Sequence, residues 1–146
     1  MFAIFDKLAS PIVFAGLLAA ICATNVASAA AADIPYLYQR FANPAYKTTL
    51  DNLFKGKQTV TWLQVYLRTK NGVDNPGQAI TVAGKPYELY EVCQPHNCAG
   101  NFLYVLFVPG GRAATALLTV DGSNSEFFGN PDDDQKNALQ AAGAKQ

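Results

Sequence analysis

The segment Phe102-Leu103-Tyr104-Val105-Leu106-Phe107-Val108 says most about how this chain of 146 residues folds. It holds no charged or strongly polar side chain, and such a run is typical of a central strand that is covered on both faces of a sheet. Pro109-Gly110-Gly111 follows as a turn signal, and residues 113–120 form a second strand-like segment. We therefore predict a hairpin of residues 101–108 and 113–120.

A second hairpin is predicted before this one. Residues 79–82 and 87–93 carry β-branched and aromatic side chains, and Ala83-Gly84-Lys85 between them indicates a turn. Glycine, asparagine and proline gather in residues 71–77, and turn-forming residues also gather in residues 121–125. Both of these stretches are predicted to be loops.

A helix is predicted before the strands. Asn43 can cap the free N–H groups of a helix over residues 45–55, and Pro44 fits its first turn. Gly56 suits the left-handed position that follows the end of a helix. The predicted core face holds Tyr46, Leu50, Leu53 and Phe54, which share one side at helical spacing.

Another helix is predicted after the strands. Asn130-Pro131 repeats the capping pattern, and Asp132 to Asp134 follow in the first turn, where the helix dipole favours anions. We interpret this acidic run as a capping feature rather than a metal site. The helix is expected to end near Ala142, before Gly143.

Two shorter segments complete the predicted fold. A helical turn is expected around residues 36–41. Residues 61–70 fit either a strand or a helix, and the helix would place Trp62, Val65, Tyr66 and Thr69 on one face. The order of helix, antiparallel strands and helix predicts an α+β domain with an antiparallel sheet of about five strands.

The segment Cys93-Gln94-Pro95-His96-Asn97-Cys98 lies between the two hairpins and contains the only histidine of the chain. Two cysteines this close allow a disulfide staple, a redox pair or part of a metal site. A redox pair usually has C-x-x-C spacing, and a zinc site needs a fourth ligand that no second cluster supplies. We favour the disulfide, which would present a lone imidazole on a rigid loop that projects from the end of a strand.

The N-terminal segment has the pattern of a secretory signal peptide. Residues 8–23 are almost wholly apolar, and small residues with A-x-A frames follow. The signal peptide is expected to span residues 1–29, with cleavage between residues 29 and 32, and residues 33–146 then form one domain. A transmembrane anchor is the alternative, but Pro11 interrupts the apolar run.

Removal of the signal peptide changes the cysteine count and leaves the charge at zero. Cys22 is lost, so Cys93 and Cys98 remain as an even pair, which is typical of a disulfide in an exported protein. Asp6 and Lys7 are lost together, so the acidic and basic residues still balance. A chain with no basic stripe and no cationic amphipathic helix is not expected to bind nucleic acid or a membrane surface.

The ring sequence C-x-P-H-x-C in a small exported domain resembles the inhibitor of vertebrate lysozyme family (Ivy), whose usual loop is Cys-Lys-Pro-His-Asp-Cys. The ring is the most specific part of the resemblance, which spans most of the chain after the signal peptide. Four further segments resemble that family in the expected order, namely residues 43–46, 82–87, 105–107 and 128–131.

The resemblance implies a periplasmic α+β protein with an antiparallel sheet and helices packed on one side. It also implies that the loop enters the active-site cleft of c-type lysozyme, where His96 would meet the catalytic carboxylates. Cys93 and Cys98 would hold the loop, and Pro95 would shape it. No cofactor or metal is expected. Proteins of this family can self-associate, so a homodimer is an open option.

Two residues of the ring depart from the usual motif. Gln94 stands where Lys is common, and Asn97 stands where Asp is common. One positive and one negative charge are replaced by amides, so the formal charge of the loop is unchanged. The amides keep their hydrogen-bonding capacity but lose the strength that charge adds to a hydrogen bond.

Two other classes of function are weighed against lysozyme inhibition. A binding module of the same fold would act on another partner, such as an endogenous lytic glycosidase or a peptidoglycan fragment, and the two amides motivate this alternative. An enzyme is not expected, because the chain has a single histidine, no nucleophile motif and no metal cluster.

Overall fold

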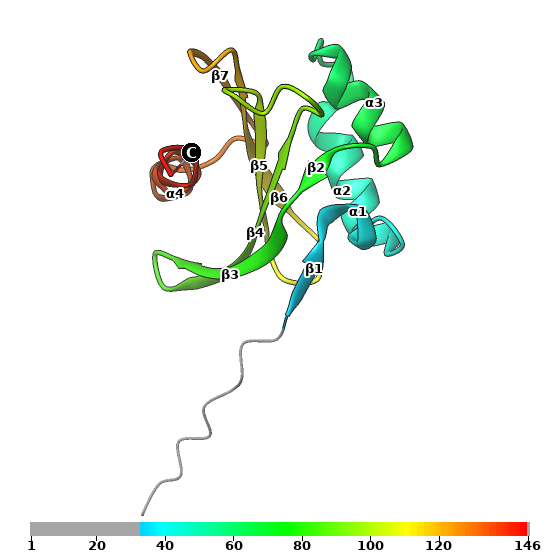
Figure 1. Ribbon diagram of the computed structural model, residues 1–146. Helices are drawn as coiled ribbons and strands as arrows, with labels where there is room; N and C mark the ends of the chain where they lie inside the picture. Colours follow the sequence, from blue (N-terminus) through cyan, green and yellow to red (C-terminus); the bar gives the residue numbers. More distant parts are fainter. Residues whose placement is uncertain (1–32, 146) are drawn as a thin grey trace, which may run out of the picture.

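Strand β5 (Phe102–Phe107) is the centre of an antiparallel sheet (Figure 1). The computed structural model describes residues 33–145, and the predicted signal peptide lies outside them. Within residues 33–145 the sheet has seven strands in the order β1-β3-β4-β5-β6-β7, and β2 pairs with β4. The other strands are β1 (Ile34–Tyr36), β2 (Val73–Asp74), β3 (Pro76–Val82), β4 (Lys85–Cys93), β6 (Ala114–Val120) and β7 (Asn124–Phe128). The helices are α1 (Leu37–Arg40), α2 (Pro44–Phe54), α3 (Thr61–Thr69) and α4 (Asp133–Gly143).

Every residue of β5 is buried, as its unbroken apolar run predicts. The odd-numbered positions of β5 pack in a core with α1, α2 and α3, and the even-numbered positions pack in a second core with α4. Helices therefore lie on both sides of the sheet (Figure 1). The predicted α+β fold with an antiparallel sheet is confirmed. The expectation that the helices pack on one side is wrong for α4, because a strand without a polar position needs cover on both faces.

The two predicted hairpins are confirmed. Ala83 and Gly84 join β3 to β4, and their φ angles of 47° and 75° are those of a two-residue turn whose twist matches the flanking strands. β5 and β6 are joined across a wider turn, at whose base the Val108 N–H donates to the Ala113 carbonyl at 2.9 Å. The central part of the sheet is thus built from neighbours in sequence.

Two segments predicted as loops are partly strands. β2 and the first residues of β3 lie within residues 71–77, and β7 begins within residues 121–125. The backbone of β3 passes close to the ring of Tyr90, so that a Cβ at Gly77 would lie 2.6 Å from a ring carbon. Pro76 is the first residue of its strand, a position where proline is tolerated. Packing against the sheet therefore outweighs the local turn signals.

The N-terminal helices follow the predicted capping. The side chain of Asn43 accepts a hydrogen bond from the Ala45 N–H at 3.0 Å at the start of α2, and α1 is the predicted helical turn. The ambiguous residues 61–70 form α3, whose buried residues are Leu63 and Tyr66. Of the face predicted for this helix, Thr69 is exposed, and its hydroxyl donates to the carbonyl of Val65 at 2.9 Å. Because its hydroxyl bonds the preceding turn of the helix, Thr69 does not contribute to the core.

The last helix starts two residues later than the first capping signal suggests. The side chain of Asp132 accepts from the Gln135 N–H at 2.8 Å, and the Gln135 side chain accepts from the Asp132 N–H at 3.0 Å. This reciprocal pair is a capping box, which makes Asp132 rather than Asn130 the N-cap of α4. Asp133 and Asp134 lie in the first turn as predicted, whereas Gly143 belongs to the helix instead of following it.

A part-buried polar network ties α1 and α2 to β4. Oε1 of Glu88 accepts from Nη2 of Arg40 at 3.0 Å. Oε2 of Glu88 accepts from the hydroxyls of Tyr46 and Tyr90 at 2.7 and 2.8 Å. Burial, with Glu88 beside them, raises the pKa of both tyrosines, so their hydroxyls stay protonated and donate. The Gly110 N–H donates to the Tyr46 hydroxyl at 3.1 Å and extends the network to the turn between β5 and β6.

Candidate functional site

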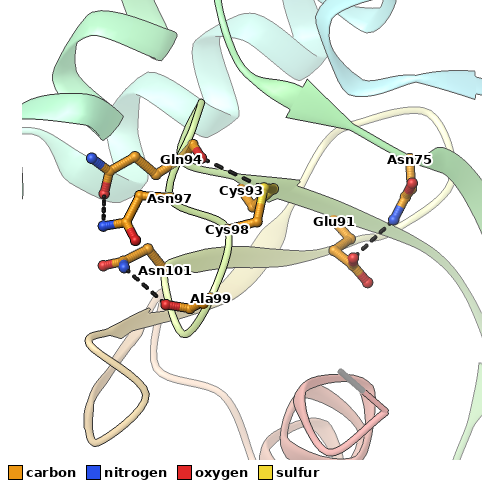
Figure 2. Close-up of a disulfide and its surroundings, with 8 residues drawn as sticks. All are labelled: Asn75, Glu91, Cys93, Gln94, Asn97, Cys98, Ala99 and Asn101. Carbon is orange, nitrogen blue, oxygen red and sulfur yellow. Dashed lines mark hydrogen bonds between the residues drawn. A yellow bond between two sulfur atoms is a disulfide. The ribbon is translucent and has the colours of Figure 1, made fainter.

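The predicted disulfide is present at the point where the chain passes from β4 to β5 (Figure 2). Cys93 is the last residue of β4 and is buried, and Cys98 lies part-buried opposite it with a Cα–Cα distance of 5.0 Å. Gln94 to Asn97 form the part of the ring that lies between the two cysteines. We call residues 93–98 the ring from here on.

The tip of the ring is a tight turn with His96 in an unusual conformation. The Asn97 N–H donates to the Gln94 carbonyl at 3.1 Å, Pro95 occupies the second position, and His96 the third with φ 62°. A positive φ at the third position is the mark of a type II turn, and glycine is the usual residue there. For a residue with a side chain, the left-handed region costs about 1–2 kcal/mol.

The imidazole of His96 is exposed and has no hydrogen-bond partner within residues 33–145. Residues with a side chain that are held in the left-handed region cluster at functional sites. The structure thus presents His96 to solvent on the tip of a cross-linked turn, as the sequence predicts.

The base of the ring is anchored by residues that sequence reasoning missed. Asn101 is 3% exposed, and its Oδ1 accepts from the Asp121 N–H at 3.2 Å. The carbonyl of Gly100 accepts from the Gly122 N–H at 2.9 Å, and the carbonyl of Asn101 accepts from the Gln94 N–H at 3.1 Å. A Cβ at Gly100 would lie 2.4 Å from the Gly122 nitrogen, so only glycine fits. These bonds join the ring to the turn between β6 and β7, which follows 20 residues later in sequence.

The two amides that depart from the usual motif face one another. Nδ2 of Asn97 lies 3.5 Å from Oε1 of Gln94, which is the weak end of hydrogen-bond geometry (Figure 2). The ring therefore carries no formal charge apart from any proton on His96. Near the ring, Asn75, which lies between β2 and β3, donates to Glu91 of β4 at 2.8 Å. The contact between the amides keeps both side chains beside the turn without a strong internal bond.

A part-buried carboxyl lies on the strand next to the base of the ring. β2 pairs with the end of β4, which places Val73 opposite Cys93 and Asp74 opposite Val92. The carboxylate of Asp74 accepts from the hydroxyl of Tyr66 at 2.8 Å. Burial raises the pKa of Asp74 to about 6, and the hydrogen bond from Tyr66 opposes this shift. Burial likewise raises the pKa of Tyr66, so the hydroxyl remains the donor.

Asp74 is expected to make the stability of the protein depend on pH between about 4 and 6. Its pKa is higher in the folded chain than in the unfolded chain, so this group stabilises the fold most at low pH and loses that contribution as the pH rises through 6. Asp74→Asn removes the charge that burial disfavours. The difference in free energy of unfolding between the variant and the wild type should therefore be about 1 kcal/mol more favourable to the variant at pH 7.5 than at pH 4.5, after allowance for solvent screening. Urea unfolding at both pH values measures this gain, and an equal difference at both would contradict the raised pKa.

Other classes of site find little support in the described part of the chain. No group of three or more His, Cys, Asp or Glu side chains in residues 33–145 is arranged to hold a metal ion. Among the same residues, no helix has the length and apolar character needed to span a membrane. The ring is therefore the feature on which the functional argument rests.

Comparison with known proteins gives one family, and its match covers the region that contains the ring. A family profile described as "Inhibitor of vertebrate lysozyme (Ivy)" matches residues 45–143. An inhibitor of vertebrate lysozyme from Pseudomonas aeruginosa is 33% identical over 95 residues, which is 65% of this chain and 60% of the relative. A Yersinia pestis protein described as uncharacterized is 26% identical over 100 residues, or 68% of this chain and 63% of the relative.

An inhibitor of vertebrate lysozyme from Escherichia coli K12 is 24% identical over 81 residues, which is 55% of this chain and 48% of the relative. The chain thus spans between about half and two thirds of the length of these curated relatives. The family profile covers well over half of the chain and includes the ring, the central sheet and α4. The chain therefore belongs to the inhibitor of vertebrate lysozyme family.

Proposed function

We propose that this protein inhibits c-type lysozyme in the periplasm by inserting the ring into the active-site cleft of the enzyme. The observation that carries this proposal is the exposed His96, which lies on the tip of an anchored, disulfide-closed turn and has no hydrogen-bond partner in the described part of the chain. Relatives from Pseudomonas aeruginosa and Escherichia coli bear the name of lysozyme inhibitors. A disulfide is also typical of an oxidising compartment outside the cytoplasm.

The chemistry of an imidazole suits the cleft of a retaining glycosidase. Such an enzyme has two catalytic carboxyl groups about 5–5.5 Å apart. The two nitrogens of His96 lie on opposite edges of its rigid imidazole, so one side chain can hydrogen-bond to both carboxyl groups. Carboxylates favour the doubly protonated imidazole, which donates from both nitrogens in charge-assisted hydrogen bonds.

The anchored ring explains how a short loop could bind tightly. Residues that must become ordered on binding oppose association by about 0.5–1.5 kcal/mol for each immobilised side chain. Here the disulfide, the turn at Pro95 and the bonds of Asn101 fix the backbone of the ring before any partner arrives. The backbone of the ring therefore loses little conformational entropy when the ring enters a cleft.

The arrangement favours a binding role over catalysis. A nucleophilic site needs a serine, threonine or cysteine within hydrogen-bond reach of a base. Within residues 33–145, His96 makes no hydrogen bond to any such side chain, and both cysteines of the ring are held in the disulfide. We therefore infer that His96 acts as a contact residue and that the protein is not an enzyme.

A titration against c-type lysozyme tests the proposal. Residues 30–146, purified with the disulfide formed, are expected to inhibit the lysis of bacterial cell walls. The variant Cys93→Ala/Cys98→Ala is expected to inhibit about tenfold less, because its loop must be ordered on binding. The double variant avoids a reducing agent that would also act on the enzyme. If the oxidised wild type does not inhibit at all, lysozyme is not the partner, and a lytic glycosidase or peptidoglycan fragment should be tested instead.

A further inference from the structure

A cavity lies at the end of the sheet opposite to the ring. It has a volume of about 450 Å³ and is bordered by α2, the residues that follow α2, the first residue of β6 and the end of β7. The ring precedes β5, whereas Ala114 of β6 pairs with Phe107 at the other end of that strand. A molecule bound in this cavity would therefore leave the ring accessible.

The polar side chains that line this cavity have no side-chain partner within the described residues. They are Thr49, Asn52, Lys57, Arg112 and Asn130. None of them makes a side-chain hydrogen bond or ion pair within residues 33–145. All five can donate hydrogen bonds, two are cationic, and no carboxylate from residues 33–145 lines the cavity. By contrast, the arginine of another cavity of this protein, Arg40, is paired with Glu88 at 3.0 Å.

The remaining wall of the cavity is apolar. It includes Leu53, Phe127 and Phe128, of which Phe128 also packs in the core against Phe54. Gly129 follows with φ 80°, and a Cβ there would lie 2.6 Å from both the Ala114 carbonyl and the Leu53 side chain. Because Gly129 has no side chain, the backbone can turn beside this apolar wall. The cavity thus combines free donors with a hydrophobic surface.

We propose that this cavity binds a small organic anion, in which a carboxylate or phosphate group is joined to an apolar body. The oxyanion would be held by Lys57 and Arg112, with the amides of Asn52 and Asn130 as further donors. Arginine and lysine bind carboxylate and phosphate groups through charge-assisted hydrogen bonds. The apolar body would cover the aromatic wall. This site is distinct from the ring and does not depend on the function proposed for it.

Ligand titrations followed by amide chemical shifts test this proposal on the protein that spans residues 30–146. The probes are phenyl phosphate, benzoate, inorganic phosphate and the neutral benzamide. Phenyl phosphate or benzoate is expected to shift the amides of Arg112, Gly129 and Asn130, and the tighter of the two identifies the preferred oxyanion. Inorganic phosphate alone should bind more weakly, because it lacks an apolar body to place against the wall.

Charge variants show whether the cavity is the site. Lys57→Gln/Arg112→Gln is expected to weaken binding of the aromatic anion by about tenfold or more, since two charge-assisted contacts are lost. The matched control Arg68→Gln/Lys85→Gln removes two exposed cations that do not line the cavity and should bind as the wild type does. Equal binding by the cavity variant, equal binding of benzamide, or no binding of either aromatic anion to the wild type would each overturn the proposal.

Discussion

His96→Asn is expected to weaken inhibition of c-type lysozyme by about tenfold or more while the free energy of unfolding hardly changes. Asparagine tolerates the left-handed conformation that His96 adopts at φ 62°, so the turn should keep its shape. The asparagine amide, however, has donors only on its one nitrogen and cannot reach two carboxyl groups from opposite edges as an imidazole can. Inhibition constants and urea unfolding of the two proteins measure both parts of this prediction.

His96→Gly separates the effect of the backbone conformation at this position from the effect of the imidazole. Glycine adopts a positive φ without strain, so this variant should be as stable as the wild type or more stable by up to about 1 kcal/mol. Its inhibition is still expected to fall as far as that of His96→Asn, because both variants lack the imidazole. If both variants inhibit as well as the wild type, then the shape of the ring blocks the cleft and His96 has no special role.

Local sequence signals were sufficient for the elements whose neighbours lie close in the chain. The apolar run of β5, its hairpin with β6 and the hairpin of β3 and β4 are confirmed because strand pairing there follows the order of the sequence. β2 could not be predicted in the same way, since its two residues form a strand only because the distant end of β4 lies beside them. The side of the sheet on which α4 packs is decided in the same manner, by contacts between β5 and the end of the chain.

The candidate site was predicted only in part, for a similar reason. The six residues of the ring carry a strong local signal in two cysteines, a proline and the only histidine. The anchors of the ring carry none, because Asn101 reads as the first residue of a strand and Gly122 as an ordinary turn residue. Their role arises from hydrogen bonds that join two turns of the sheet, and such bonds are visible only in the folded structure.

Glu88→Ala is expected to lower the free energy of unfolding by about 3 kcal/mol. The change leaves Arg40, whose side chain is 24% exposed, without its counter-charge, and it removes the acceptor of the Tyr46 and Tyr90 hydroxyls. Glu88→Gln keeps the shape and one acceptor oxygen, so it should lose about half as much. Urea unfolding with an unchanged m value measures these losses.

The exposed ion pair between Lys47 and Asp51 on α2 provides the control for this prediction. Asp51→Asn should cost less than about 0.5 kcal/mol, because exposed pairs are screened by solvent. Equal losses for the Glu88 and Asp51 variants would contradict a stabilising role for the part-buried network. The ring is held by its disulfide and by Asn101 rather than by this network. Folded Glu88→Ala protein should therefore inhibit lysozyme as the wild type does, which would separate the residues that stabilise the fold from those that bind the partner.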